Sequence, residues 1–412
     1  MCPIFVYWAG GILGVMKPFH IVRTAILFIV AIVLFLFLFK PGDLPNVSMS
    51  AFGSETQRAR VTEIIEDGEI DLGGVVQRYQ LVRVELLEGE YQGIVMEMDY
   101  GRRQVLSSAV YLEPGDNILV TIGARPDGVL TVYFVDFVRV PPLLWLTAIF
   151  AIAIILISRW KGFRSLLSMA FSLMVIIGYI IPRILSGDDP LRVSILGSII
   201  LLGVTLYLTY GWNLKTHAAV ISMVLVLFIT GTLAAVFVAF AKLTGSGDEN
   251  ALFLLQMLDT QINLRGLLLG GMIIGALGVL DDLVTTQASA VFELHHANPS
   301  LGFGALFRSA MRIGQDHVAA TVNTLVLAYA GASLPMLLMF TLGSGDLGYL
   351  VNFEFVAEEI VRTLVGSLGL VSAVPLATAI ASLFALRAES LGWWGQVLGP
   401  VGGGDGGHGH AH

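Results

Sequence analysis

Two adjacent carboxylates, Asp281 and Asp282, stand in a stretch of the chain that is otherwise almost entirely apolar. If Arg265 marks one edge of a membrane, a helix rising 1.5 Å per residue places Asp281 about 24 Å further, in a layer about 30 Å thick. Two neighbouring carboxylates cannot both ionise cheaply in a low dielectric. The pair therefore predicts a site that exchanges a proton or a cation.

A helix that continues past this pair gathers polar side chains on one face, at spacings of three and four. They are Asp282, Thr286, Ser289, Glu293 and His296. Such a stripe must face protein or water, because ionisable groups are costly in lipid. The sequence leaves a second interpretation equally open, in which the helix ends near Asp281 and both carboxylates are solvated at the cytoplasmic mouth of a short span.

A second polar group falls on the next apolar run, where Asp316 and His317 are followed by Asn323. A histidine beside a carboxylate can relay protons or bind a divalent cation. These residues are further candidates for the ion or substrate site. Hydrogen bonding between helices is the favoured role for Asn323, and Arg312 is placed at i,i+4 to satisfy Asp316.

Three other patterns favour structural roles. Two small-xxx-small pairs, Gly266 with Gly270 and Gly271 with Gly275, predict close helix packing. Glu358 and Arg362 are spaced as an intrahelical ion pair on the surface. The tail carries His408, His410 and His412 among glycines and alanines, which could bind a divalent cation weakly or be a simple solvated tail. We expect no other cofactor.

Composition identifies the class of protein that holds these groups. Of 412 residues, 56% are hydrophobic and 13% are charged, and the mean hydropathy is +0.81. Soluble chains carry about 25% charged residues, so this is a membrane protein. Its single cysteine, Cys2, excludes a disulfide framework and Cys-based zinc or iron–sulfur modules. A net charge of -8 with scattered basic residues argues against a nucleic-acid partner.

The first 140 residues divide into an N-terminal segment (1–40) and a β-rich domain (41–140). The unbroken apolar run 24–39 predicts an uncleaved anchor helix; residues 1–15 are a poor lead-in to it, and Met16 would be a more ordinary start. Alternating apolar and polar positions after it predict a small β-barrel, OB-like or sandwich-like. One hairpin should turn at Glu88–Glu90 and a second at Arg125–Gly128.

The remaining chain predicts a helical membrane domain (141–386) and a cytoplasmic His/Gly-rich tail (387–412). Seven further spans fit the length that a bilayer requires: 141–158, 165–182, 193–212, 218–241, 266–284, 317–342 and 358–386. The fold class is thus an all-α polytopic membrane protein of about eight transmembrane helices, with the barrel inserted between the first and second. The excess of Lys and Arg on alternate loops predicts cytoplasmic termini and an extracytoplasmic barrel.

Several signatures give a resemblance to a known family. They are Gly275–Asp282, Gln287–Val291, Arg308–Asp316, Asn323–Tyr329, Glu359–Arg362 and Val374–Leu376. In these segments the chain resembles the YibE/F family of bacterial multi-pass membrane proteins, over essentially residues 20–386. The resemblance implies a helical domain of the bacterial plasma membrane preceded by an extracytoplasmic β domain. It leaves the activity open.

The leading functional hypothesis is a transporter or permease for an ion or small solute, coupled to protons or a cation through Asp281, Asp282, Asp316 and His317. The alternative is a membrane-anchored envelope assembly factor that binds a protein partner through residues 45–138. An intramembrane hydrolase using Asp281 and Asp316 is disfavoured, because neither aspartate stands in a Gly-x-Gly-Asp motif and a His-Glu-x-x-His motif is absent. We therefore expect a protein that is not an enzyme. A P-loop is also absent, so active transport would need an ion gradient or a separate ATPase.

Overall fold

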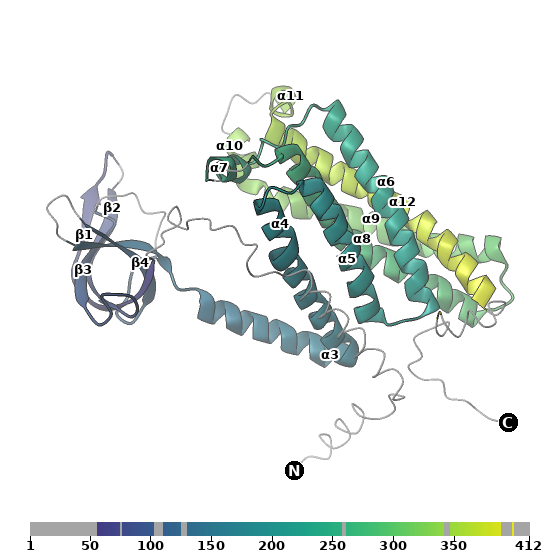
Figure 1. Cartoon of the computed structure of the whole chain (residues 1–412), viewed down its shortest axis with the longest axis horizontal. Helices are drawn as coiled ribbons and strands as arrows, with labels where there is room; N and C mark the ends of the chain where they lie inside the picture. Colours follow the sequence, from purple (N-terminus) through teal and green to yellow (C-terminus); the bar gives the residue numbers. More distant parts are fainter. Residues whose placement is uncertain are drawn as a thin grey trace, which may run out of the picture. The chain divides into compact units, whose positions relative to one another are not determined.

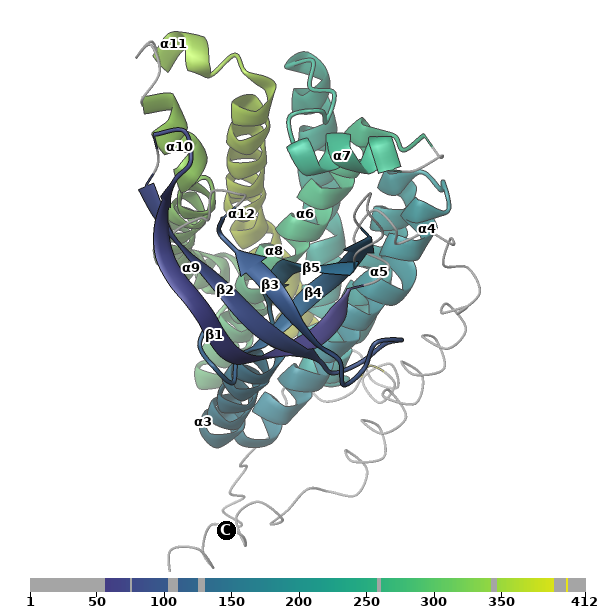
Figure 2. The same cartoon turned by 90° about the vertical axis from the view of Figure 1, so that its left-hand side faces the viewer.

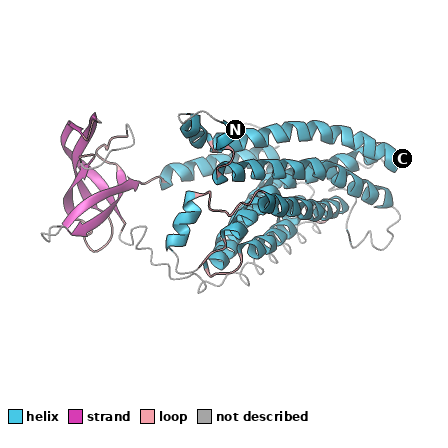
Figure 3. Ribbon diagram, turned by 90° about the horizontal axis from the view of Figure 1, so that it is seen from above, coloured by secondary structure: helices cyan, strands magenta, loops and turns pink. Residues whose placement is uncertain are grey.

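The computed structural model describes residues 56–74, 76–102, 110–124, 130–257, 261–341, 347–388 and 398. The chain divides into two compact units, one formed by residues 46–153 and the other by 1–45 with 154–412. Strands occur in the first unit, and the second is helical in its described part (Figure 3). The predicted anchor run 24–39 and the histidine tail lie outside the described residues.

The first unit is a closed five-stranded barrel (Figures 1 and 2). Its strands are β1 (Gln57–Asp71), β2 (Val76–Leu86), β3 (Val95–Tyr100), β4 (Asn117–Ala124) and β5 (Leu130–Phe137). They follow the order β1-β2-β3-β5-β4, and β4 closes the barrel on β1. The β3–β5 pairing is parallel and the others are antiparallel. A five-stranded closed barrel agrees with the predicted small barrel, and its strand count is that of an OB fold.

Alternation of side chains explains why these strands close around one core. In β2, Val82, Val84 and Leu86 are buried whereas Arg83 is exposed, so one face of the strand points inward. The β2–β3 hairpin is confirmed, and Gly89 adopts φ +90° at its turn, a conformation that favours glycine. The β4–β5 hairpin is also confirmed, although its turn lies outside the described residues.

Five helical segments are long and apolar enough to cross a membrane among the residues that the structure describes. They are Val140–Leu185, Pro190–Tyr210 (α5), Leu214–Phe240 (α6), Leu264–Ala297 (α8) and Glu354–Arg387 (α12). The first comprises α3 (Val140–Val175), a π-helical turn η3 (Ile176–Ile180) and α4 (Ile181–Leu185). Shorter helices are α7 (Glu249–Met257), α10 (Leu334–Thr341) and α11 (Leu347–Leu350). The length and composition of these helices indicate a membrane protein.

Two predicted spans, 141–158 and 165–182, fall within the first of these segments. Arg159 interrupts the helical backbone there with φ 50° and ψ -127°, and α3 changes direction (Figure 1). Gly162 permits this bend, because a Cβ at that position would lie 2.5 Å from the carbonyl oxygen of Ile154. The break thus falls between the two predicted spans.

The predicted span 317–342 differs more from the structure. Helix α9 (Phe303–Ala332) starts well before it, and the helical backbone breaks at Ser333 before α10. Because α9 carries polar residues along its length, it is not among the five apolar segments. Helix α8 also extends past its predicted end at residue 284, reaching Ala297.

Helix α8 is the central element of the bundle, since it packs against α5, α6, α9 and α12 (Figure 1). Its buried side includes Leu280, Leu283, Val284 and Val291, which belong to one continuous apolar core. Asn263 caps its first turn by accepting a hydrogen bond from the Gly266 amide (3.1 Å). The predicted carboxylates Asp281, Asp282 and Glu293 therefore project from a helix that is firmly packed in the bundle.

Candidate functional site

The Asp281–Asp282 pair lies in the interior of α8, which continues for four more turns beyond it. The interpretation in which the helix ends near Asp281 is therefore wrong. The start of α8 lies beside the start of α5, where Asn263 approaches Asp189 (Nδ2–Oδ2 3.4 Å). The two helices then run parallel as far as Tyr210, the last residue of α5, whose hydroxyl is 3.2 Å from that of Thr285. Asp281 thus lies about one turn inside the end of a neighbouring span.

Asp281 has one carboxylate oxygen, Oδ1, that is buried and has no hydrogen-bond partner among the described residues. The Thr285 hydroxyl one turn further donates to the backbone carbonyl of Asp281 (2.8 Å) rather than to its carboxylate. The adjacent Asp282 is exposed. The pair therefore joins one enclosed carboxylate to one that faces away from the bundle.

The rest of the predicted polar stripe keeps to one side of α8, as its spacing requires. Thr286, Glu293 and His296 are exposed and Ser289 is half-buried, with its hydroxyl donating to the Thr285 carbonyl (2.8 Å). The Thr286 hydroxyl lies 3.5 Å from Oδ1 of Asp282. Because Tyr210 ends α5 at the height of Thr285, this part of the stripe extends beyond the end of that span.

On α9, Asp316 and Asn323 are exposed and His317 is half-buried. The predicted Arg312–Asp316 pair does not form: within the described part of the chain, no ion pair links the two side chains, which are both exposed. Helix α9 packs against α8 through Gln287, whose Nε2 donates to the Ala310 carbonyl (2.9 Å).

That contact sets the relative heights of the two helices. They are consecutive and antiparallel, so Asp316 lies within about one turn of the height of Asp282. The structure thus brings the predicted carboxylates to one depth, on neighbouring helices. No hydrogen bond between described residues joins them directly.

Gln287 is a key residue for helix packing that the sequence patterns did not single out. It is 3% exposed, and its amide also donates to the Thr378 hydroxyl of α12 (2.7 Å), so one side chain joins three helices. The signal was present in the sequence, since Gln287 is spaced by four from both Leu283 and Val291 on the apolar face of α8. A polar residue at such a position needs partners from other helices.

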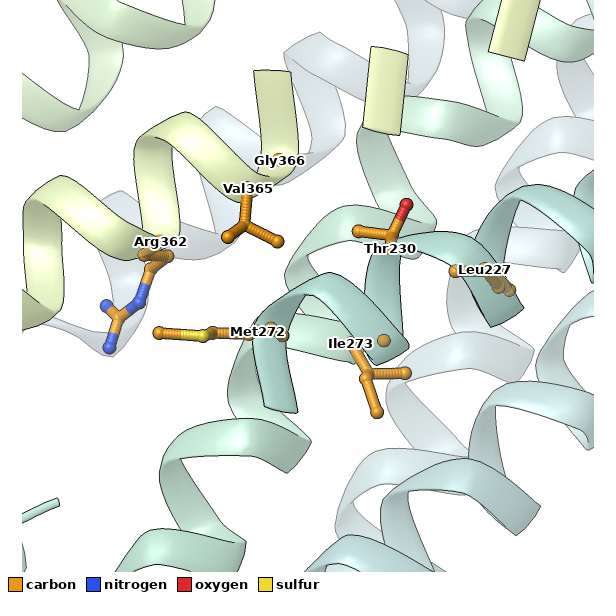
Figure 4. A pocket seen from close by; sticks show the side chains of 9 residues that line it. Leu227, Thr230, Met272, Ile273, Arg362, Val365 and Gly366 are labelled. Atoms are coloured by element: carbon orange, nitrogen blue, oxygen red, sulfur yellow. The ribbon is translucent and has the colours of Figure 1, made fainter. Parts of the chain in front are cut away.

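A second polar group lies nearer the start of α8, around Arg362 of α12 (Figure 4). Two small hollows share Arg362, Met272 and Gly366 among their lining residues, and the first also includes Thr230 of α6. The guanidinium donates to Glu359 (2.7 Å), while its Nε is buried without a partner among the described residues.

The predicted Glu358–Arg362 surface pair is therefore wrong. Glu358 is 4% exposed and accepts a hydrogen bond from the Gly247 amide (3.2 Å). Glu354, one turn earlier, accepts from the Thr244 hydroxyl (2.8 Å) and the Gly245 amide (2.9 Å). These two carboxylates hold the loop after α6, which leaves Glu359 to pair with Arg362.

The four glycines predicted to mediate packing separate into two groups. A Cβ at Gly270 would lie 2.3 Å from the Ser194 hydroxyl of α5, and one at Gly266 would lie 3.0 Å from Asn263. At Gly271 a Cβ would meet nothing within 4 Å, and at Gly275 only the Tyr329 hydroxyl at 3.8 Å. Close packing through Gly270 is thus a property of one side of α8.

Metal binding remains a prediction. His408, His410 and His412 lie outside the described residues. Within the part of the chain that is described, no three His, Cys, Asp or Glu side chains form a group that could hold a metal ion.

A family profile relates this chain to other proteins. The profile of the YibE/F-like protein family matches residues 146–387. The chain belongs to the YibE/F-like family. In this YibE/F-like protein the match contains both polar groups, around Asp281 and around Arg362, whereas the barrel lies outside it. No curated protein and no solved structure matches the chain.

Proposed function

We propose that this YibE/F-like protein is a transporter or permease that moves an ion or small solute across the bacterial plasma membrane, with proton or cation exchange at Asp281. One observation carries the proposal. Asp281 has a buried carboxylate oxygen without a partner among the described residues, and it lies inside an unbroken helix that is long and apolar enough to cross a membrane.

The physical argument concerns charge compensation. An ionised carboxylate in a low-dielectric interior is costly unless hydrogen bonds or an opposite charge offset it. Asp282, the next residue, adds a like charge instead. A proton or a mobile cation at Asp281 would remove this cost, and its reversible binding is what coupled transport requires.

A buried polar residue with a merely structural role in this bundle has its hydrogen bonds formed. Gln287, only six residues further along α8, is buried and donates to two acceptors. The small, mostly apolar hollow that Arg362 lines lies near Met272, about 14 Å from Asp281 along the axis of α8. Asp281 on α8 and Arg362 on the neighbouring α12 thus place polar groups at two depths, which supports a route for solute between these helices.

The orientation is part of the same proposal. Lys and Arg residues favour both termini in the cytoplasm and the barrel outside. In that arrangement Asp281 lies in the cytoplasmic half of the membrane, and Arg362 in the outer half.

The test is proton flux in liposomes that contain the purified full-length protein and a pH-sensitive dye. Candidate ions are supplied one at a time as driving gradients. We expect Asp281→Asn to lower the coupled flux at least tenfold, and Glu249→Gln, an exposed acidic residue outside α8, to leave it unchanged. Thermal unfolding of each variant checks its folding. Wild-type flux in folded Asp281→Asn would remove this residue from the mechanism.

A specific observation also favours the second candidate function, an envelope assembly factor. The neighbouring strands β3 and β5 expose Val95 (53%), Tyr133 (41%) and Val135 (46%), which are apolar side chains suited to a protein partner. Affinity capture with residues 45–138 would discriminate. A specific envelope protein bound to this fragment, together with no ion flux in liposomes, would favour the assembly factor.

A further inference from the structure

Helix α9 presents an outward face that does not match a lipid environment. Its residues follow one another at spacings of four, three, four, three and four, which is the repeat of a helix–helix seam. They are Arg312, Asp316, Ala319, Asn323, Val326 and Ala330, and all six are exposed. Three are polar and two are alanines.

The part of this face from Ala319 to Ala330 lies at membrane depth. Gly314 of α9 contacts Val374 of α12 and Gln287 of α8, and Tyr329 lies near Gly275 of α8. From Gly314 to Tyr329, α9 therefore runs beside α8 from Gln287 back to Gly275. Asn323 thus lies well inside the apolar segment, and Asp316 lies near the height at which α5 ends. Asp316 and Asn323 fall between these two contacts.

Lipid cannot satisfy these side chains. Asp316 and Asn323 make no hydrogen bond through their side chains to any described residue, and an unpaired amide or carboxylate in hydrocarbon is unfavourable. The predicted anchor 24–39 could not satisfy them either, since Thr24 is its only polar residue. The partner must itself offer charged and amide groups.

We propose that this face binds the same face of a second copy of the chain. Two copies inserted in one bilayer share their orientation, so a twofold axis along the membrane normal brings the two α9 helices together in parallel and in register. Asn323 then meets Asn323 of the other copy, and each amide can both donate and accept.

Charge and size agree with this pairing. Arg312 and Asp316 are one turn, about 6 Å, apart along the seam, so each arginine can reach the aspartate of the other copy. Ala319 and Ala330 permit close approach of the two backbones. The face is thus complementary to itself in charge, hydrogen bonding and shape.

Disulfide trapping in native membranes tests the inference. Cys2 is the only cysteine, so a Cys2→Ser background is free of other thiols. We expect Ala319→Cys, Asn323→Cys and Ala330→Cys each to give a covalent dimer on mild oxidation. Phe228→Cys on α6, a position 74% exposed, is the matched control and should remain monomeric.

The mass of the uncrosslinked protein in nanodiscs gives an independent measurement. We expect the wild-type protein to have twice the mass of the 44.3 kDa chain. Asn323→Leu should weaken the dimer by about threefold to thirtyfold. A monomeric wild-type protein would overturn the inference, as would α9 cysteines that trap no dimer, that react no better than Phe228→Cys, or that join only to a different protein.

Discussion

The barrel and the helical bundle each bury polar side chains, but Gln80 of the barrel and Asp281 of the bundle differ in whether those groups are hydrogen-bonded. In the barrel, Gln80 is 1% exposed, and its amide both donates to the Leu112 carbonyl (3.2 Å) and accepts from the Leu112 amide (2.8 Å). In the bundle, Oδ1 of Asp281 and Nε of Arg362 are buried without partners among the described residues. The barrel also has such a group, Oε1 of Gln57, but the buried ionisable groups without partners among the described residues are all in the bundle. An ionisable group is the most costly kind to leave unpaired, so these residues indicate where function is to be sought.

Charged side chains on the surface also differ between the two units in whether they are paired. On the barrel, Arg78 pairs with Asp67, and Arg102 pairs with Glu66 (3.0 Å). On α9, Arg312 and Asp316 face outward without pairing to each other. These barrel charges are thus paired within one unit, whereas the two charges on α9 are left for the second copy in the proposed dimer.

The largest expected difference in stability is between removing the hydrogen-bonding amide of Gln80 and removing the charge of Asp281. We expect Gln80→Leu to lower the free energy of unfolding of the barrel by about 2–5 kcal/mol, because it leaves both backbone groups of a buried residue unpaired. Asp281→Asn should leave the melting temperature of the bundle unchanged or raise it, because it removes an uncompensated charge. Thermal and urea unfolding measure both, and a clear loss of bundle stability in Asp281→Asn would show that its carboxylate is structural.

A smaller effect should separate the two sides of α8. Gly270→Ala would force a methyl group against Ser194, so we expect a loss of about 1–3 kcal/mol in the stability of the bundle. Gly271→Ala enters open space and should be neutral, or stabilising by up to about 1 kcal/mol through its higher helix propensity. Melting temperatures of the two variants give the comparison. Equal losses would contradict the assignment of one packed and one open side.

The smallest effect concerns the charged pairs of the barrel. Hydrogen bonding from Arg78 holds the pKa of Asp67 below its usual range, and the Tyr79 hydroxyl, with Arg102, does the same for Glu66. Since each pKa is lower in the folded state, these pairs stabilise the barrel above the ordinary carboxyl pKa near 4, and this contribution is lost as the pH falls through the folded value. The effect is small because the side chains are exposed.

Thermal unfolding of the isolated barrel between pH 7 and pH 2 measures this contribution. We expect Arg78→Gln to reduce the fall in melting temperature with acid, and Arg60→Gln, at an exposed position outside both pairs, to leave it as in the wild type. An unchanged acid sensitivity in Arg78→Gln would contradict the role of the Asp67 pair.

Sequence patterns that depend on neighbouring residues were informative about the fold. Alternation in the segment of Val82 and Val84 predicted a strand with one buried face, and the Glu88–Glu90 turn predicted the β2–β3 hairpin. Apolar runs of membrane length predicted α5, α6 and α12 close to their observed bounds. These features follow from local periodicity and from the thickness of a bilayer, so one sequence contains the information.

The sequence by itself determined that this is a membrane protein with a β-rich insertion, and that carboxylates lie within its apolar segments. Tertiary structure decided what each polar residue faces. Only packing made Gln287 a satisfied bridge and left Asp281 with an oxygen that no described residue pairs with. Only the loop after α6 turned Glu358 away from Arg362. The physical reason is that helical spacing fixes which residues share a face, whereas the partner of that face comes from residues distant in the chain.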